Sequence, residues 1–216
     1  MTNWTKWLIA IPFSIAVSIG IPGLIAGDFF WFSNHWSDAI FVFFSGGMWL
    51  VATAFVDIDR PRGKPDIANR LIPIGLIFSI IISVIDRTYW IASVLPNYIK
   101  VFGLFFSFAA IVLGLQSRRI LGQSYSPRAS HSSTNKLVQC GPYRWIRHPL
   151  YLAAIIWTIG WPLIIKSLIG SLSGLCFVLP AIHKRMIIEE LLMRQAFGKE
   201  YIDYQNKTWR LLPFIY

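Results

Sequence analysis

The stretch WLIAIPFSIAVSIGIPGLIAG, residues 7–27, contains 21 residues and no ionisable side chain. A helix of about 20 such residues spans the hydrocarbon core of a bilayer, which is roughly 30 Å thick. A second uncharged run of 18 residues, 39–56, meets the same criterion. The first run follows a single basic residue, Lys6, and has no small-residue cleavage site, so we interpret it as a retained span and not as a signal peptide.

The composition extends this interpretation to the whole chain. Of its 216 residues, 55% are hydrophobic and only 14% are charged, whereas a typical soluble domain has about 25% charged residues. Four further apolar stretches follow, at 71–85, 95–115, 149–165 and 167–182. Several are short for a span, and tilt or snorkelling of flanking basic residues can make up the difference. We therefore predict an all-α, polytopic transmembrane bundle of about six spans.

The net charge of +10 could suggest a nucleic-acid partner, but the placement of the charges favours a membrane. With the N-terminus in the cytosol and six crossings, seventeen of the 20 Lys and Arg residues lie on the cytosolic side. The three exceptions are Arg87, Lys100 and Lys166. This asymmetry follows the positive-inside rule. It predicts cytosolic termini, membrane lipids as partners and no nucleic acid.

Most of the polar residues lie in the second half of the chain. We divide the whole chain into two regions. Residues 1–116 hold the first four spans, and residues 117–216 hold a long loop, the last hairpin and the tail. The loop at 117–148 is rich in Ser, Gly and Arg, and a loop of this length is usually functional or disordered. The earlier connector at 57–70 is rich in Pro and charge and is typical of a solvated loop.

The densest polar cluster is GPYRWIRHPLY, residues 141–151. Pro149 suits the first turn of a helix and places His148 near its cap, where free backbone N–H groups follow. A helix start flanked by arginines can bind an anion. On composition alone, Arg144 and Arg147 would instead meet lipid phosphates, and the aromatic residues of the cluster would form an interfacial belt.

A second polar cluster follows the apolar run 167–182, which we expect to continue as one helix out of the membrane. Arg185 and Glu189 are spaced to pair at i,i+4, and so are Glu190 and Arg194. Such pairs on a surface contribute only a few tenths of a kcal/mol. Ionisable groups this close to a membrane boundary, however, tend to be functional.

Gly170 and Gly174 form a GxxxG pattern inside the same run. Small residues at this spacing let two helices approach closely. We expect the pattern to serve packing of the last hairpin, with dimerisation as the alternative.

Four motifs occur in order over the last third of the chain: Arg147-His148-Pro149-x-Tyr151, Arg185-x3-Glu189-Glu190, Phe197-Gly198-x-Glu200-Tyr201-x2-Tyr204 and Leu212-Pro213-Phe214-Ile215. Together they resemble the isoprenylcysteine carboxyl methyltransferase family of integral membrane enzymes. The resemblance covers roughly residues 140–216, and the first half of the chain matches only in being a set of apolar spans.

The resemblance implies a C-terminal cytosolic cofactor-binding region and S-adenosylmethionine-dependent methylation of a lipophilic acceptor. The acceptor implied is the carboxylate of an isoprenylcysteine-type, prenylated or lipid-like substrate that enters from the bilayer. Consistent with a pocket unlike that of soluble enzymes, the chain has no Gly-x-Gly-x-x-Gly. Carried over by position, the implied catalytic residues are Arg185 and Glu189, the implied substrate-binding residues are Arg185 and Trp157, and the implied cofactor-binding residues are Tyr143, His148, Tyr151, Glu189 and Glu190.

Three alternatives remain at this stage. A phospholipid N-methyltransferase would need a base for its amine acceptor, a role open to Glu189, Glu190 or His148. An NADPH-dependent sterol-type reductase would be expected to carry Gly-Asp soon after the motif tyrosine, but Leu152 and Ala153 follow Tyr151. A membrane scaffold or transporter would be expected to carry charges within several spans.

Location and metal content complete the predictions. The resemblance implies a multi-pass protein of the inner or plasma membrane in a prokaryote, or of the endoplasmic reticulum in a eukaryote, with its active site facing the cytosol. Since no His, Cys or acidic pair has a recognised ligand spacing, no metal site is predicted.

Overall fold

The structure is a computed structural model that describes residues 19, 21–27, 38–41, 67–89, 94–121 and 137–213. Most of the two predicted N-terminal spans lies outside these residues. The described helices are α2 (Ile21–Ala26), α4 (Ile67–Tyr89), α5 (Tyr98–Leu121), the 3-10 helix η5 (Gly141–Arg144), α6 (Pro149–Leu163), α7 (Leu168–Phe197) and α8 (Lys199–Lys207). The prediction of an all-α chain is confirmed for this part, where the only β-type pairing is a single bridge between Ile146 and Trp209.

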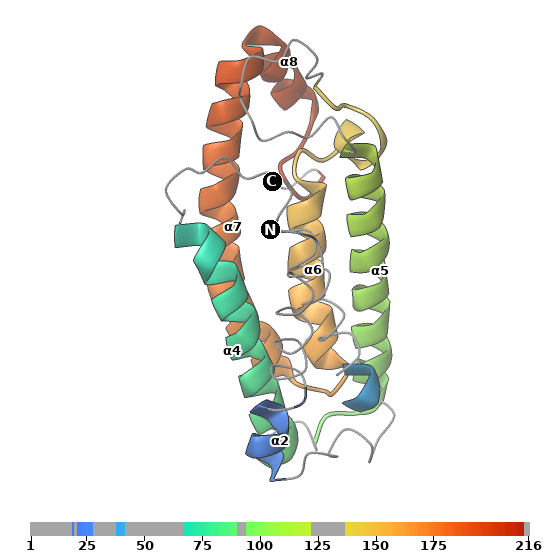
Figure 1. Cartoon of the computed structure of the whole chain (residues 1–216). Helices are drawn as coiled ribbons and strands as arrows, with labels where there is room; N and C mark the ends of the chain where they lie inside the picture. The colour runs from blue at the N-terminus through green and yellow to red at the C-terminus, as the bar shows by residue number, and fades with distance from the viewer. Residues whose placement is uncertain are drawn as a thin grey trace, which may run out of the picture.

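The long helices form an elongated bundle, shown in Figure 1, in which α6 stands between α5 and α7. α5 packs along α6, α4 packs along α7, and α6 also contacts α7. The short helix α8 caps one end of the bundle, and α2 lies against α4 at the other end (Figure 1). The polar C-terminal segments are therefore gathered at the α8 end.

α5 and α7 are long and apolar enough to cross a membrane by length and composition, and α6 is a shorter apolar helix of 15 residues. α4 runs for 23 residues without a break, or about 34 Å. It begins at Ile67, so the predicted connector at 57–70 extends too far. The sequence Pro65-Asp66 just before it is a typical helix start signal.

The last hairpin confirms the prediction that one helix continues beyond residue 182. Pro149 opens α6, and Ser167 caps α7 by accepting a hydrogen bond of 2.9 Å from the backbone N–H of Gly170. α7 then runs for 30 residues, or about 45 Å. Its first half is apolar and its second half carries the predicted charged cluster, so the helix is longer than a hydrocarbon core and its polar end projects from the apolar part of the bundle.

Glycines set the distances between the helices. A Cβ on Gly170 would lie 1.9 Å from Ser83 Oγ on α4, and a Cβ on Gly174 would lie 2.7 Å from Thr158 Cγ2 on α6. The GxxxG pattern therefore serves packing within the chain, as predicted, but it faces α4 as well as the hairpin partner. The hydroxyl of Ser79 on α4 donates to the Gly170 carbonyl at 2.7 Å, a contact that this close approach permits.

The crossing of α5 and α6 gives a matched pair of test substitutions. A Cβ on Gly103 would lie 2.6 Å from the backbone nitrogen of Ile164, whereas a Cβ on Gly114, on the same helix, would meet only Ala153 Cβ at 3.7 Å. We expect Gly103→Ala to destabilise the protein by about 1–3 kcal/mol, because backbone atoms cannot move aside without separating the helices. Gly114→Ala should be neutral or stabilising by up to about 1 kcal/mol through helix propensity.

Thermal unfolding of the detergent-purified variants measures both effects. Equal melting temperatures for the two variants would show that the close α5–α6 crossing is not present.

Candidate functional site

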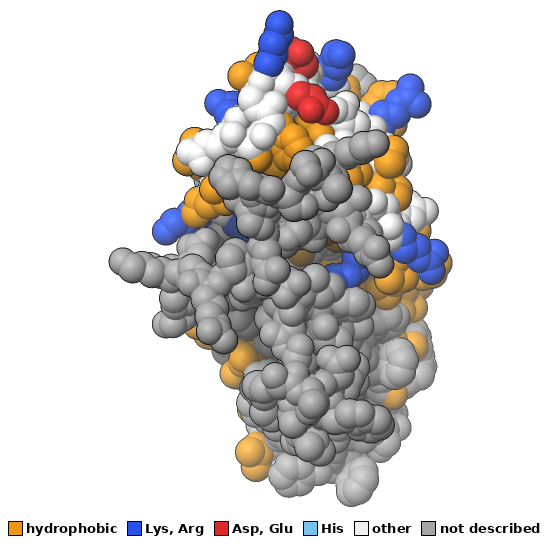
Figure 2. All heavy atoms as spheres, turned by 45° about the horizontal axis from the view of Figure 1, so that its top comes forward, with side chains coloured by type: hydrophobic (Ala, Val, Ile, Leu, Met, Phe, Trp, Pro, Cys, Tyr) orange, Lys and Arg blue, Asp and Glu red, His pale blue; other side chains and the backbone are white. Residues whose placement is uncertain are grey.

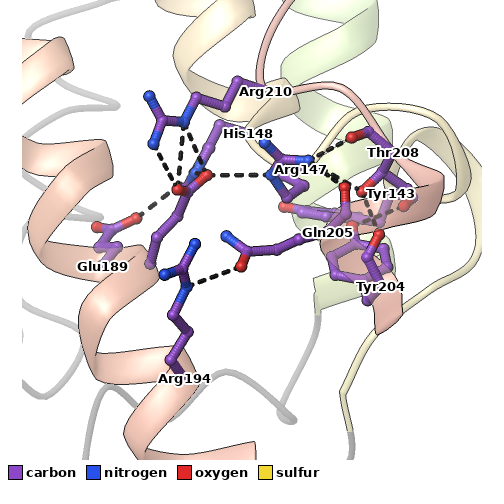
Figure 3. A network of polar contacts seen from close by, with 10 residues as sticks. Tyr143, Arg147, His148, Glu189, Arg194, Tyr204, Gln205, Thr208 and Arg210 are labelled. Atoms are coloured by element: carbon purple, nitrogen blue, oxygen red, sulfur yellow. Dashed lines mark hydrogen bonds and ion pairs between the residues drawn. The ribbon is translucent and has the colours of Figure 1, made fainter. Parts of the chain in front are cut away.

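The centre of the polar end is the carboxylate of Glu190, whose side chain is only 4% exposed. Arg147 donates from Nε to Oε1 at 3.0 Å, and Arg210 donates from Nη2 to Oε2 at 2.7 Å. His148 Nε2 lies 3.4 Å from Oε1. In Figure 3 these three side chains converge on one carboxylate from the η5–α6 segment and from the C-terminal tail. We call this group the Glu190 cluster.

The cluster keeps Glu190 ionised. Burial by itself would raise the pKa of this carboxyl, but the hydrogen bonds from His148, Arg210 and Arg147 outweigh burial and hold the pKa well below its usual range. Glu190 belongs to the charged second half of α7, beyond the apolar segment. A buried carboxylate with this many donors is a structural anion, because each donor would lose its partner if the carboxylate were removed.

Backbone hydrogen bonds reinforce the same contact. Arg147 N donates to Trp209 O at 2.7 Å, His148 N donates to Arg210 O at 3.1 Å, and Trp209 N donates to Trp145 O at 3.0 Å. The guanidinium of Arg147 also donates from Nη1 to the carbonyl oxygens of Gln205, at 3.0 Å, and Thr208. The tail after α8 is thus fixed alongside the segment that leads into α6.

A second group forms around Glu189, one residue earlier on α7. The hydroxyl of Tyr151 donates to Glu189 Oε1, and Arg185 Nε donates to the same oxygen at 3.1 Å and to the Tyr151 hydroxyl at 2.6 Å. The predicted i,i+4 pair of Arg185 and Glu189 is therefore confirmed. We call these three residues the Glu189 group.

His148 joins the two groups. It is buried, with Nε2 toward Glu190 and Nδ1 3.9 Å from Glu189 Oε2, and its ring lies 5.6 Å from that of Tyr151 between centroids. Its backbone conformation, with φ −122° and ψ 58°, is not helical, which agrees with the bias against helical dihedrals that Pro149 imposes on the residue before it. The Arg-His-Pro-x-Tyr motif thereby contacts both glutamates at once.

Tyr143 lies on the side of the Glu190 cluster that faces away from Glu189 (Figure 3). Its side chain is buried, and its carbonyl oxygen accepts a hydrogen bond of 2.7 Å from the hydroxyl of Tyr204 on α8. Burial raises the pKa of Tyr204 to about 12, so this hydroxyl remains a donor at every physiological pH. The contact attaches η5 to α8, as the right side of Figure 3 shows.

Trp157 does not belong to either group. It packs against the apolar core formed by Phe41, Ile80, Val84, Trp161, Ile164 and Ile165. It lies six residues beyond Tyr151, or about 9 Å farther along α6. The structure thus brings together Tyr151, His148, Glu189, Glu190 and Arg185, with Tyr143 adjacent, whereas the assignment of Trp157 to substrate binding stays a prediction.

A cavity of about 440 Å³ opens between α7, α8 and the tail. Apart from Ile202, its lining residues carry polar or charged groups: Arg147, Glu190, Arg194, Gln205, Asn206 and Arg210. Small-molecule sites usually have volumes of roughly 300–1,000 Å³. The cavity thus has room for a small polar ligand and offers it cationic and amide groups.

Two interpretations of single residues from the sequence are wrong. Arg147 does not face lipid phosphates, since its side chain is only 12% exposed and pairs with Glu190. Within the described residues Arg194 pairs not with Glu190 but with Gln205, whose Oε1 accepts from Arg194 Nε at 2.8 Å. Arg147, His148 and Arg210 already surround Glu190, so the i,i+4 partner is displaced.

Sequence reasoning also missed Arg210, Tyr204 and Gln205 as members of the site. Arg210 precedes the Leu212-Pro213 motif by two residues, but nothing in its local pattern indicates a partner 20 positions earlier. Tyr204 occurs in the sequence only as the last residue of the Phe197-Gly198 motif, which does not indicate its partner. The one available signal was the position of these residues within motifs that carry the resemblance.

The chain is similar to known membrane methyltransferases. Residues 98–200 match the model of the phospholipid methyltransferase family (PEMT). The matched range begins at α5 and ends in α8, so it contains both glutamates and the whole Glu189 group but not Arg210, the member of the Glu190 cluster that comes from the tail.

Individual relatives are more specific. The chain is 28% identical over 131 residues to a probable protein-S-isoprenylcysteine O-methyltransferase of Oryza sativa subsp. indica, covering 60% of this chain and 65% of the relative. It is 32% identical over 111 residues to the protein-S-isoprenylcysteine O-methyltransferase of Saccharomyces cerevisiae, covering 49% of this chain and 46% of the relative. It is 34% identical over 84 residues to the human protein of the same name, covering 39% of this chain and 30% of the relative. The chain therefore spans less than two thirds of the length of these relatives, from 30% to 65%.

The fold agrees. A solved structure of the eukaryotic intramembrane Ras methyltransferase ICMT (isoprenylcysteine carboxyl methyltransferase) matches with a TM-score of 0.64 and 22% identity. The match covers 99% of this chain and 81% of that one. The resemblance to the isoprenylcysteine carboxyl methyltransferase family that the motifs predicted is confirmed.

The Glu190 cluster predicts a specific dependence of stability on pH. Glu190→Gln should lower stability at pH 7 by roughly 3 kcal/mol, because two guanidinium groups lose their buried counter-charge. A carboxyl whose pKa is lowered by folding stabilises the protein fully above its ordinary value of 4.5, and this contribution is lost as the pH falls through the lowered pKa. The difference between wild type and Glu190→Gln should therefore be constant from pH 5 to 8 and shrink below about pH 4.

Melting temperatures from pH 3 to 8 test this. The matched control is Glu200→Gln on α8, where the glutamate is exposed. If Glu190→Gln melts at the same temperature as Glu200→Gln at neutral pH, the buried cluster is not formed.

Proposed function

We propose that this chain is a membrane methyltransferase that transfers the methyl group of S-adenosylmethionine to the carboxylate of a lipophilic, isoprenylcysteine-type acceptor. The observation that carries the proposal is the meeting of two distant motifs. Tyr151 of the Arg-His-Pro-x-Tyr motif contacts Arg185 and Glu189, and His148 lies between both glutamates. The relatives reported above are named protein-S-isoprenylcysteine O-methyltransferases, which supports the same reaction here.

The residues present fit a cofactor with a carboxylate, an amino group and hydroxyls. Arg194, Arg210 and the side-chain amides of Gln205 and Asn206 line the 440 Å³ cavity beside Glu190. Cations and amides suit the carboxylate of such a cofactor. When bound, S-adenosylmethionine supplies an electrophilic methyl group on a sulfonium centre. We assign its binding to Tyr143, His148, Tyr151, Glu189 and Glu190, of which Glu190 lines this cavity.

The contacts of the two glutamates support a different role for each in this task. Glu190 uses its oxygens on Arg147, His148 and Arg210, so it shapes the cavity wall and fixes the cations in place. Glu189 is more exposed, at 21%, and only its Oε1 is held by Tyr151 and Arg185. Oε2 of Glu189 is thus the carboxylate oxygen best placed to accept from a ligand hydroxyl or amine.

Arg185 is assigned to the acceptor. Its Nε is held by Tyr151 and Glu189, and among the described residues its two terminal Nη groups make no hydrogen bond or ion pair. A guanidinium edge that is fixed but available can hold a carboxylate through a planar fork. The acceptor carboxylate is already ionised and needs no general base. One of its oxygens bonds to the methyl carbon while the carbon–sulfur bond breaks and its electron pair stays on sulfur, so the protein mainly holds the groups in line.

The position of the site suits a lipophilic acceptor and a polar cofactor. Glu189 follows the apolar half of α7 by about two turns, so an acceptor in the bilayer reaches it from one side and a soluble cofactor from the other. We retain about six spans, cytosolic termini, a cytosolic site and residues 117–216 as the catalytic region within this proposal. Figure 2 shows basic side chains around the α8 end of the bundle, as a cytosolic surface would carry.

A phospholipid N-methyltransferase is the second candidate, because the matched family model is that of phospholipid methyltransferases. An amine acceptor has to lose a proton, and Glu189 is the exposed carboxylate that could take it. In that case the rate would rise with pH as the acceptor amine loses its proton, whereas carboxylate methylation would not require deprotonation in this range.

Ligand binding separates the cofactor residues from the acceptor residue. Calorimetry of the detergent-purified chain should show saturable binding of S-adenosylmethionine and S-adenosylhomocysteine. Glu189→Ala should weaken it by roughly 10-fold or more, because a charged hydrogen bond contributes about 1.5–3 kcal/mol. Arg185→Ala should leave it nearly unchanged, and the exposed Glu200→Gln serves as control. Binding of NADPH in place of the adenosyl ligands would overturn the proposal in favour of a reductase.

Steady-state kinetics test the acceptor. With a farnesylated cysteine derivative as acceptor, Arg185→Lys should reduce kcat/KM by roughly 10–100-fold, because a lysine cannot reproduce a bidentate contact. The KM for S-adenosylmethionine should stay close to that of wild type. Equal activity on the acceptor without its prenyl group would contradict entry from the bilayer.

A further inference from the structure

One face of α5 carries a continuous apolar stripe. Val101, Phe105, Phe108, Val112 and Leu115 are between 36% and 66% exposed. Their spacing of three or four residues places them in one line along the helix. Arg119 follows Val101 by 18 residues, which is five full turns, so its side chain stands at the end of the same line.

A cavity of about 490 Å³ lies where this stripe ends. α5 contributes Gln116, Arg119 and Ile120 to its lining, and the η5 region contributes Gly141, Pro142 and Trp145. Most of this lining is apolar, and Arg119 is the one ionisable residue among the described residues that form it. The cavity is separate from the Glu190 cluster and shares no lining residue with the cavity beside it.

The wall of this cavity depends on a glycine. Gly141 has φ +58°, and a Cβ there would lie 2.1 Å from Ile120 Cδ1. The absence of a side chain lets η5 lie directly against the last turn of α5. Trp145, which follows η5, is 55% exposed. The guanidinium of Arg144 lies 5.5 Å from the centre of the Trp145 ring.

The chain segment that forms this cavity carries basic residues and no acidic ones. No Asp or Glu occurs between Asp86 and Glu189. Arg119 and Arg144 are both exposed, and in the described ranges neither forms an ion pair. Two guanidinium groups and an exposed Trp at the end of an apolar helix face are complementary to an anionic headgroup with an attached hydrocarbon chain.

We propose that the cavity between the end of α5 and η5 binds an anionic phospholipid, with its phosphate at Arg119 and Arg144 and an acyl chain along the α5 stripe. A soluble phosphate would use the cations but not the five apolar residues in line with them. A neutral lipid chain would use the stripe but would not need the cations. The lipid is a bound partner, distinct from the methyl acceptor, and the site does not depend on the proposed reaction.

Lipid retention tests the proposal. The full chain is placed in nanodiscs of phosphatidylcholine with about 30% phosphatidylglycerol, released into mild detergent and examined by native mass spectrometry. Wild type should retain one phosphatidylglycerol per chain in preference to phosphatidylcholine. Arg119→Gln should reduce this preference by roughly 10-fold, the size of one charged hydrogen bond, and Arg119→Lys should recover part of it.

The controls separate the sources of binding. Lys199→Gln removes an exposed charge at the same end of the bundle and should retain the lipid like wild type. Phe108→Ser should weaken retention through the acyl chain without changing the charge. Equal retention of the two lipids by wild type, unchanged retention by Arg119→Gln, or full displacement of the lipid by millimolar inorganic phosphate would each overturn the proposal.

Discussion

The polar end of this molecule depends on one constraint, which is that the carboxylate of Glu190 is buried and charged. A charge in that position is costly unless it is paired and hydrogen-bonded on every side. Its partners come from segments far apart in the chain: Arg147 and His148 from 43 and 42 positions earlier, and Arg210 from 20 positions later. Neutralising one side chain on α7 therefore requires the η5–α6 segment and the tail to meet there.

That meeting fixes the site beside it. Once Arg147 is held by Glu190, its backbone and that of His148 pair with the tail, and His148 is placed within reach of Glu189. Adjacent residues on a helix point about 100° apart. Glu190 thus faces inward to the cations, whereas Glu189 faces Tyr151 and Arg185. A pair of identical side chains acquires two roles: one holds the tail and the other remains partly accessible for a ligand.

Local features of the fold were predictable from the sequence. The apolar run and charged extension of α7 predicted one long helix, Pro149 predicted the start of α6, and spacing predicted the Arg185–Glu189 pair. These depend on neighbours within a few positions. The apolar stretches predicted at 71–85 and 95–115 begin a few residues away from the first residues of α4 and α5, Ile67 and Tyr98. The start of an apolar stretch need not coincide with the start of a helix.

The site itself was predictable only through resemblance. Composition places Arg147 near a membrane surface but does not reveal a carboxylate 43 positions later. The spacing of Glu190 and Arg194 predicts an ion pair, but Arg194 pairs with Gln205 instead. Competition among cations for one buried carboxylate is decided by tertiary packing. Arg210 could not be assigned for the same reason, because the tail has no periodic pattern that would orient it.

A double-mutant cycle tests whether the Glu190 cluster is the contact on which the site depends. The affinity for S-adenosylhomocysteine is measured by calorimetry for wild type, Glu190→Gln, Arg210→Gln and the double variant. If the two residues act as one unit, the losses should be strongly non-additive, with a coupling of about 1 kcal/mol or more. Additive losses, or single variants that bind like wild type, would contradict the account.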